Sequence, residues 1–329
     1  MENKRKWRWG VNRWFVFLFM AIAIVGASFF PAISPHIQVA PEKLTEHPLF
    51  TLPIIGEFIP TNTLVAVLIV DVILLAMALM VRSATKSGEM VPKGISGAVE
   101  ALLEALYNLT ESTAGKWTKT IFPYFATITL MVLMSNWLEL IPGVDSIGKI
   151  EPSAHGYLLK DITSGIAAIV KGGTVAEGQG YNIVPYVRVP STDLNFTVAL
   201  AIVSVVMTQV IGLRAQGFSY FSKFLNFTTL FKKPAFGLMD LLISILELIS
   251  ELSKLLSFSF RLFGNIFAGS VLLFLVGSIL PAGASWIQSG ILLFEFFIGL
   301  IQAIVFGMLT MVFMSMATHG HGSEEHAEA

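Results

Sequence analysis

Six long apolar runs limit this chain to one class of fold. They cover approximately residues 14–30, 63–81, 123–141, 193–213, 238–280 and 287–316. A helix needs ~20 predominantly apolar residues to cross the hydrocarbon core of a bilayer, and each run approaches or exceeds that length. Only 13% of the 329 residues are charged, whereas a soluble domain has about 25%. The sequence therefore predicts an all-α integral membrane protein with about six membrane helices.

The chain divides into four parts. Residues 1–33 hold a basic segment and the first apolar run, which is either a signal peptide or an uncleaved anchor, and we favour the anchor. Residues 34–61 are expected to form an outer loop, residues 62–317 a membrane domain, and residues 318–329 a polar tail. Within the membrane domain, residues 142–192 are polar and rich in glycine, so we expect an extramembrane loop that could be partly disordered.

Several classes of function are excluded by what the sequence lacks. Without cysteines the chain has no thiol catalysis, cysteine-ligated cluster or disulfide. It has neither a Gly-rich phosphate loop of the GxxxxGK(S/T) type nor an HExxH zinc motif. Its net charge of −1 gives no indication of nucleic acid binding. We expect no cofactor and no metal site, and we expect the tail histidines to be solvated.

Residues 95–115 predict an amphipathic helix in addition to the membrane helices. Glu100, Glu104, Asn108 and Glu111 fall on one helical stripe, and the leucines lie mostly away from it. Such a helix lies in a membrane interface or packs on another subunit. A simple solvated face explains the carboxylates equally well.

The basic residues predict the orientation of the chain. With the N-terminus inside and alternating crossings, fourteen Lys and Arg fall in inner segments and five in outer segments. Because cytoplasmic segments carry the excess of positive charge, the N- and C-termini are both expected on the inside.

Arg261 places a permanent charge in the middle of a long apolar run. An arginine at the bilayer centre costs at least ~2.5 kcal/mol on insertion scales and stays protonated at physiological pH. Such a residue implies an anionic partner or a wet cavity. Glu295, deep in the last apolar run, is a second ionisable residue of this kind.

Polar residues form two groups around Arg261. The inner group is Glu247, Ser250 and Glu251, and the outer group is Asn265, Ser270, Glu295, Gln302, Glu139 and Asp193. Two offset wet paths that meet at a fixed positive charge would suit proton transfer onto a moving carboxylate, because the charge repels a hydronium and favours the ionised carboxylate. Simpler readings stay open: interfacial or capping carboxylates, a lysine at position 254 paired with a glutamate, and amides that hydrogen-bond between helices.

Five segments together resemble one family, subunit a of F-type ATP synthases, over approximately residues 45–317. They are NWLELIP (136–142), VPSTDLN (189–195), ISELSK (249–254), SFRLFGNIFAG (259–269) and LIQAIVFGMLTMVFMSMA (300–317). The resemblance implies a non-catalytic membrane stator that faces a rotating ring of c subunits, with two C-terminal helices in a long tilted hairpin. It implies b-type peripheral stalk subunits and the rest of the F1Fo complex as further partners, besides membrane lipid.

The same resemblance implies roles for individual residues. Arg261 matches the essential arginine that faces the ring carboxylate, and Asn265 and Gln302 match polar residues beside it. Glu247 and Ser250 match the inner half-channel, and Glu139 and Asp193 match the outer one. The implied location is a bacterial inner (plasma) membrane with a cytoplasmic C-terminus, and a thylakoid membrane is the alternative.

The sequence departs from the common pattern of that family at two positions. Many bacterial relatives have an acidic residue where Ser270 stands and a histidine where Glu295 stands. We therefore expect Glu295 alone to serve as the proton relay. Two functions are alternatives to the stator: a self-contained secondary transporter and a structural scaffold. The first usually needs internal repeats, which are not visible, and the second leaves Arg261 and Glu295 unexplained.

Overall fold

The computed structural model describes most of residues 38–319 and six positions between 13 and 25. The gaps within 38–319 are 54–55, 87–93, 142–143, 154–156, 164–165, 171–179, 224–233 and 280–284. The expected membrane helix at 14–30 and nearly all of the expected polar tail therefore lie outside the described residues.

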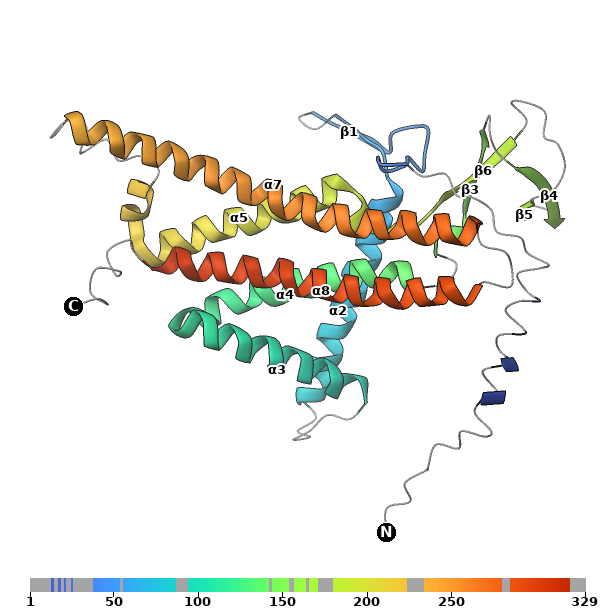
Figure 1. The fold of residues 1–329 in the computed structure, drawn as a ribbon, viewed down its shortest axis with the longest axis horizontal. Coiled ribbons are helices and arrows are strands. Elements are labelled where there is room, and N and C mark those ends of the chain that lie inside the picture. Colours follow the sequence, from blue (N-terminus) through green and yellow to red (C-terminus); the bar gives the residue numbers. More distant parts are fainter. Residues whose placement is uncertain are drawn as a thin grey trace, which may run out of the picture.

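Six long helices form the described part of the membrane domain (Figure 1). They are α2 (Asn62–Lys86), α3 (Ile95–Ala114), α4 (Thr118–Trp137), α5 (Leu194–Gln216), α7 (Pro234–Ile279) and α8 (Ser285–Thr318). Within the described residues, five stretches are long and apolar enough to cross a membrane, one of them running through α3 and α4. The mostly helical structure confirms the predicted fold class.

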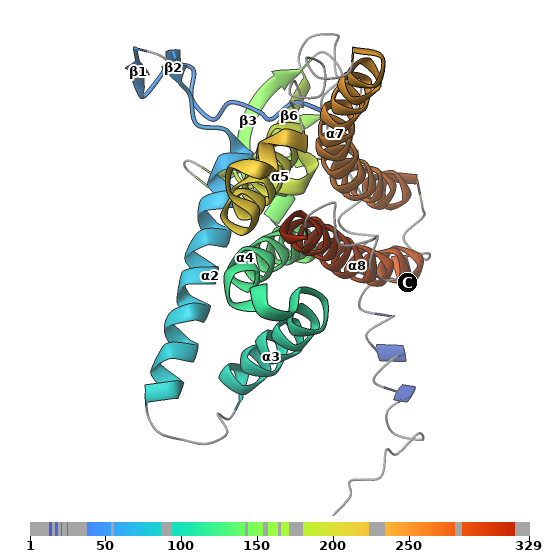
Figure 2. The same ribbon diagram turned by 90° about the vertical axis from the view of Figure 1, so that its left-hand side faces the viewer.

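The two C-terminal helices form a long antiparallel pair. At 1.5 Å per residue, the 46 residues of α7 extend ~69 Å and the 34 residues of α8 ~51 Å. The hydrocarbon core is only ~30 Å thick, so helices of this length fit inside it only when strongly tilted. Figures 1 and 2 show that α2 runs at a steep angle to the axes of α7 and α8.

The amphipathic pattern at 95–115 is confirmed in α3. The predicted polar stripe is exposed, whereas Leu106, Thr110 and Ala114 are buried. The buried face packs on α4, α2 and α8. Leu106 shares a core with Phe125 of α4 and Met311 of α8. The leucines therefore attach this helix to the bundle.

A second apolar core lies between α4, α5, α7 and α8. Phe258 and Leu262 of α7 and Phe306 of α8 are almost fully buried there. The Phe258 ring lies 5.4 Å from the Phe306 ring and 5.6 Å from that of Phe313. These rings fill the middle of the α7–α8 pair.

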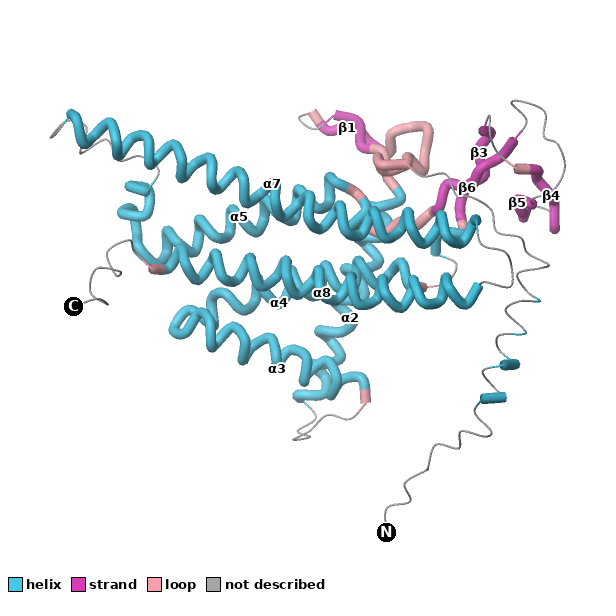
Figure 3. The backbone as a smooth tube through the Cα atoms, viewed as in Figure 1, coloured by secondary structure: helices cyan, strands magenta, loops and turns pink. Residues whose placement is uncertain are grey.

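The outer segments contain short antiparallel strands, which differs from the loops expected at 34–61 and 142–192. The pairs are β1 (Phe50–Leu52) with β2 (Gly56–Phe58), β3 (Gly148–Ser153) with β6 (Gly180–Pro185), and β4 (Leu158–Thr163) with β5 (Ile166–Val170). Figure 3 shows β3–β6 near the end of the bundle where α7 ends and α8 begins. Apolar β-branched residues such as Ile150, opposite Ile183, favour pairing there.

Close contact between α4 and α8 depends on glycine. A Cβ built at Gly307 of α8 would overlap the Thr129 hydroxyl and would lie 3.0 Å from the Phe125 ring. Thr129 cannot turn away without losing its hydrogen bond of 2.7 Å to the Phe125 carbonyl. The backbones therefore approach at a distance that only glycine permits.

We predict that Gly307→Ala destabilises the protein by about 1–2 kcal/mol, because overpacking costs ~1–3 kcal/mol and alanine recovers part of this through helix propensity. The thermal unfolding midpoint of the purified protein should fall by several degrees. Gly290→Ala on the same helix is the matched control, since nothing lies within 4 Å of a Cβ there, and it should raise the midpoint. A rise for Gly307→Ala would contradict the close-packing argument.

Candidate functional site

Arg261 lies on the exposed surface of α7. Its neighbours Leu262 and Ile266 are buried in the bundle, whereas Arg261 and Asn265 are exposed. Among the described residues, Arg261 has no hydrogen-bond or ion-pair partner. The exposed surface around it is apolar, with Phe260 55% exposed. A permanent charge on an apolar surface points to an anionic partner outside this chain.

The amides predicted beside Arg261 do meet. Asn265 Nδ2 donates to Gln302 Oε1 of α8 at 2.7 Å. Gln302 is buried, and its Nε2 has no hydrogen-bond partner among the described residues. This N–H can therefore donate to a water or to a group that approaches Arg261.

Glu295, Ser270 and Glu139 come together from three elements. The Glu295 carboxyl is buried against Gly269 of α7, where a Cβ would overlap both of its oxygens. The Ser270 hydroxyl donates to the Ile266 carbonyl at 3.0 Å and also contacts Glu139, which is close enough to interact electrostatically with Glu295. One oxygen of each glutamate has no partner within the described residues. These two oxygens can therefore accept a hydrogen bond from water or bind a proton.

A cavity of about 70 Å³ opens beside this cluster. The ionisable and hydroxyl residues among those that line it are Glu139, Ser270, Asp145, Arg188 and Glu42. Its volume suffices for a small number of water molecules. No local pattern marks Asp145, Arg188 and Glu42 as part of the site, because all three lie in segments expected to be loops and only the tertiary fold brings them beside Glu139.

Arg188 lines this cavity and makes three hydrogen bonds. It donates to the carbonyls of Gln38 (2.5 Å) and Ala40 (3.0 Å) and to the Thr192 hydroxyl (3.2 Å). Burial lowers the pKa of Arg188, and the nearby carboxylates of Glu42, Asp193 and Asp145 oppose this change. Burial raises the pKa of Asp145 to about 6, against the effect of Arg188.

Asp193 has the contacts of a helix cap. Its carboxylate accepts from the Asn195 backbone N–H at 2.9 Å, at the start of α5, and from the Thr63 hydroxyl of α2 at 2.8 Å. Asp193 does not line the 70 Å³ cavity. The capping alternative therefore explains its described contacts, and the residue ties α2 to α5.

The three residues of the inner group differ in burial. Glu247 is half-buried and Ser250 is exposed, whereas Glu251 is buried. Glu251 Oε1 accepts from Lys254 Nζ at 2.9 Å, and Oε2 accepts from Gln209 Nε2 of α5 at 3.1 Å. A hydrogen bond thus joins Glu251 of the inner group to α5.

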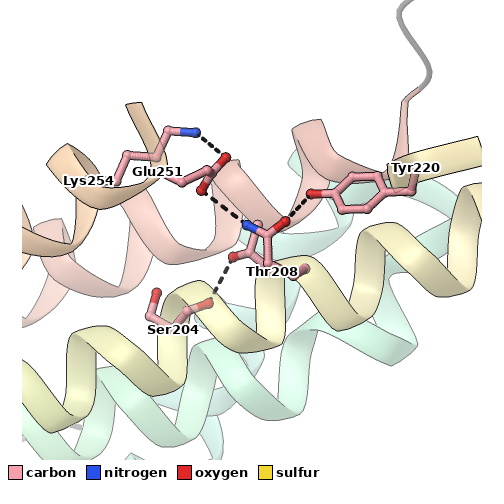
Figure 4. Close-up of polar contacts among 6 residues, drawn as sticks. Ser204, Thr208, Tyr220, Glu251 and Lys254 are labelled. Carbon is pink, nitrogen blue, oxygen red and sulfur yellow. Dashed lines mark hydrogen bonds and ion pairs between the residues drawn. The ribbon is translucent and has the colours of Figure 1, made fainter. Parts of the chain in front are cut away.

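Two residues missed in the sequence complete this inner network. The Tyr220 hydroxyl donates to Gln209 Oε1 at 2.6 Å, so that Tyr220, Gln209, Glu251 and Lys254 form one connected chain (Figure 4). Gln209 lies in an apolar run and Tyr220 in a basic linker, and neither position carries a local signal of function.

A sequence model described as "ATP synthase A chain" matches residues 63–315. The chain belongs to this family. Three relatives named "ATP synthase subunit a" are similar along most of their length. The protein of Syntrophobacter fumaroxidans is 27% identical over 272 residues, which cover 83% of this chain and 88% of the relative. Those of Mycobacterium bovis and Campylobacter jejuni are each 29% identical, cover 80% and 76% of this chain, and are covered over 89% and 88% of their own length.

Family membership and the five long apolar stretches agree with a multi-pass membrane protein. The matched region includes both members of the α7–α8 pair and every residue of the two polar groups. It also includes the outer strands β3 to β6.

We predict that Asp145 makes stability depend on pH. Because its pKa is about 6 in the folded protein and 3.8 ordinarily, the folded state binds this proton more tightly than the unfolded chain. The free energy of unfolding should therefore fall as pH rises from about 4 to about 6, by at most about 3 kcal/mol, and less where water reaches the group.

The measurement is the thermal midpoint of the purified protein between pH 4.5 and 7. Asp145→Asn should flatten the profile relative to the unsubstituted protein. Glu57→Gln, an exposed carboxyl on β2, is the control and should leave the profile unchanged. A profile for Asp145→Asn identical to that of the unsubstituted protein would refute the assignment.

Proposed function

We propose that this chain is the proton-translocating stator subunit of an F-type ATP synthase. It provides two offset half-channels that load and unload the carboxylates of a rotating ring of c subunits, in a bacterial inner (plasma) membrane with the C-terminus in the cytoplasm. The observation that supports this most is an exposed, unpartnered Arg261 between two separate polar networks, on a chain of the ATP synthase A chain family.

The exposed surface of the α7–α8 pair suits an apolar helical partner. Large side chains exposed there are Leu252, Leu256, Phe260, Leu272, Leu275, Leu293, Phe297 and Ile301. An apolar surface of this kind marks a protein or membrane contact. A c ring could slide along it, because apolar contacts are not directional. Arg261 would meet each ring carboxylate as it passes and would favour its ionised form.

The outer half-channel would run through the cavity to Glu295. A proton reaching Glu139 has the Ser270 hydroxyl and the Glu295 carboxyl within reach. From Glu295, the amide pair of Asn265 and Gln302 lies further along the same antiparallel helices, towards Arg261. Glu295 would then hold the proton at the position from which a ring carboxylate collects it.

The inner half-channel would use the network around Glu251, with Glu247 and Ser250 nearer the surface of α7. Lys254 neutralises Glu251, and Gln209 and Tyr220 fix the orientation of its carboxylate. We assign this cluster to proton release on the cytoplasmic side. The b-type stalk and the remaining F1Fo subunits, where ATP chemistry takes place, would hold the stator in place.

The two paths must not connect directly, and the packing between them supplies a barrier. Phe258, Leu262 and Phe306 fill the bundle between the Glu295 cluster and the Glu251 cluster. A dry apolar core excludes the water that a proton would need. A proton would therefore cross only while bound to the moving ring.

We predict that Arg261→Ala abolishes ATP-driven acidification of inverted membrane vesicles, with at least a tenfold loss, while the complex still assembles and hydrolyses ATP. Removing the guanidinium removes the charge that separates the paths. Val72→Ala, which shortens an exposed apolar side chain on α2 without changing charge, should keep pumping within about twofold. Pumping that survives in an assembled Arg261→Ala complex would contradict the stator assignment.

We predict that Glu295→Gln lowers ATP-driven pumping severely, because an amide fills the same space but carries no exchangeable carboxyl proton. Ser270→Ala should have a mild effect, since its hydroxyl positions the relay and is not itself the relay. The same vesicle assay measures both. If Glu295→Gln pumps normally, the relay runs through another group.

A further inference from the structure

A second, larger hollow lies on the strand side of the 70 Å³ cavity. It has a volume of about 330 Å³, between residues 38–43 on one side and strands β3 and β6 on the other. The polar residues that line it are Gln38, Glu42, Lys43, Glu151, Ser153 and Asn182.

The two hollows are neighbours with common walls. Gln38, Glu42 and Ile183 line both of them. Pro185, two residues beyond Ile183 on β6, lines only the cavity beside Glu139. One strand therefore passes along both hollows, and three shared residues bring them next to each other.

Specific contacts hold these walls in position. Arg188 fixes residues 38–40 through the carbonyls of Gln38 and Ala40. Lys149 pairs with Glu151 at 3.2 Å and with Glu46 at 3.6 Å, which joins β3 to the segment that precedes β1. The larger hollow is therefore a built feature of the outer segments.

The polar lining of the larger hollow suits water. Asn182 Nδ2 donates to Ser153 Oγ at 3.0 Å, at the edge of the β3–β6 pair. The carboxylates of Glu42 and Glu151 are balanced by Lys43 and by Lys149, which pairs with Glu151. A hollow of this size with polar walls has room for water, through which hydronium can move.

We propose that the β3–β6 pair and residues 38–43 form the entrance of the outer half-channel. Hydronium or another small cation reaches Glu139 by way of the larger hollow, and does not enter directly between the helix ends. This inference rests on the proposed function and adds the route by which the site meets the outer solution.

The test uses the absence of cysteine from the natural chain. Ser153→Cys is placed in the complete complex, and right-side-out membranes are treated with a membrane-impermeant trimethylammonium methanethiosulfonate. Inverted vesicles prepared from them are then assayed for ATP-driven pumping. We expect at least a threefold loss relative to the unlabelled variant, reversed by dithiothreitol, because a bulky fixed cation obstructs and repels ions in the hollow.

Two control positions lie outside both hollows. Leu159 on β4 is 38% exposed and Thr51 on β1 is exposed, and neither lines a cavity. Leu159→Cys and Thr51→Cys should accept the label without loss of pumping. Equal losses at these positions would show a general disturbance of the outer segments and would overturn the proposal.

The remaining outcomes separate this inference from the proposed function. Complete labelling of Ser153→Cys, shown by mass, without loss of pumping would place the entrance elsewhere, and so would a Ser153→Cys that fails to react. Arg261→Ala tests the stator assignment independently. If Arg261→Ala stops pumping while labelled Ser153→Cys does not, the function stands and only the entrance is wrong.

Discussion

A guanidinium that none of the described residues neutralises is the constraint on which the rest of the structure depends. Arg261 points off the bundle into an apolar surface, and the described residues offer it no carboxylate. Glu251, the nearest acidic residue along α7, is already occupied by Lys254 and Gln209. The arrangement therefore supports the proposal of an anionic partner outside the chain.

Insulation between the two polar networks is the second requirement, and the packing of α7 on α8 provides it. Gly269 lets the Glu295 carboxyl approach the α7 backbone, and Gly307 lets α8 approach α4. Between these close contacts, aromatic rings such as those of Phe258 and Phe306 fill the interior. Small residues thus set the distance between helices, and large ones exclude water.

The outer segments do more than connect helices. Arg188 joins residues 38–40 to the start of α5, and Lys149 joins β3 to Glu46. These contacts bring Asp145 and Glu42 to the cavity beside Glu139. The hydrogen bonds of Arg188 therefore connect residues 38–40 with the residues that line this cavity.

The sequence by itself predicted the membrane helices that the structure describes and the amphipathic α3, because apolar length and helical period are local properties. It also singled out Arg261 and Glu295 as candidates, because a charge inside an apolar run is visible without the fold. The tertiary structure alone decided which polar groups meet. It placed Gln209 in hydrogen bond with Glu251, and Tyr220 in hydrogen bond with Gln209. It also placed Asp193 as the cap of α5 and brought Asp145 and Arg188 to the cavity beside Glu139. These pairings join residues from different elements, and no local pattern records the packing that brings them together.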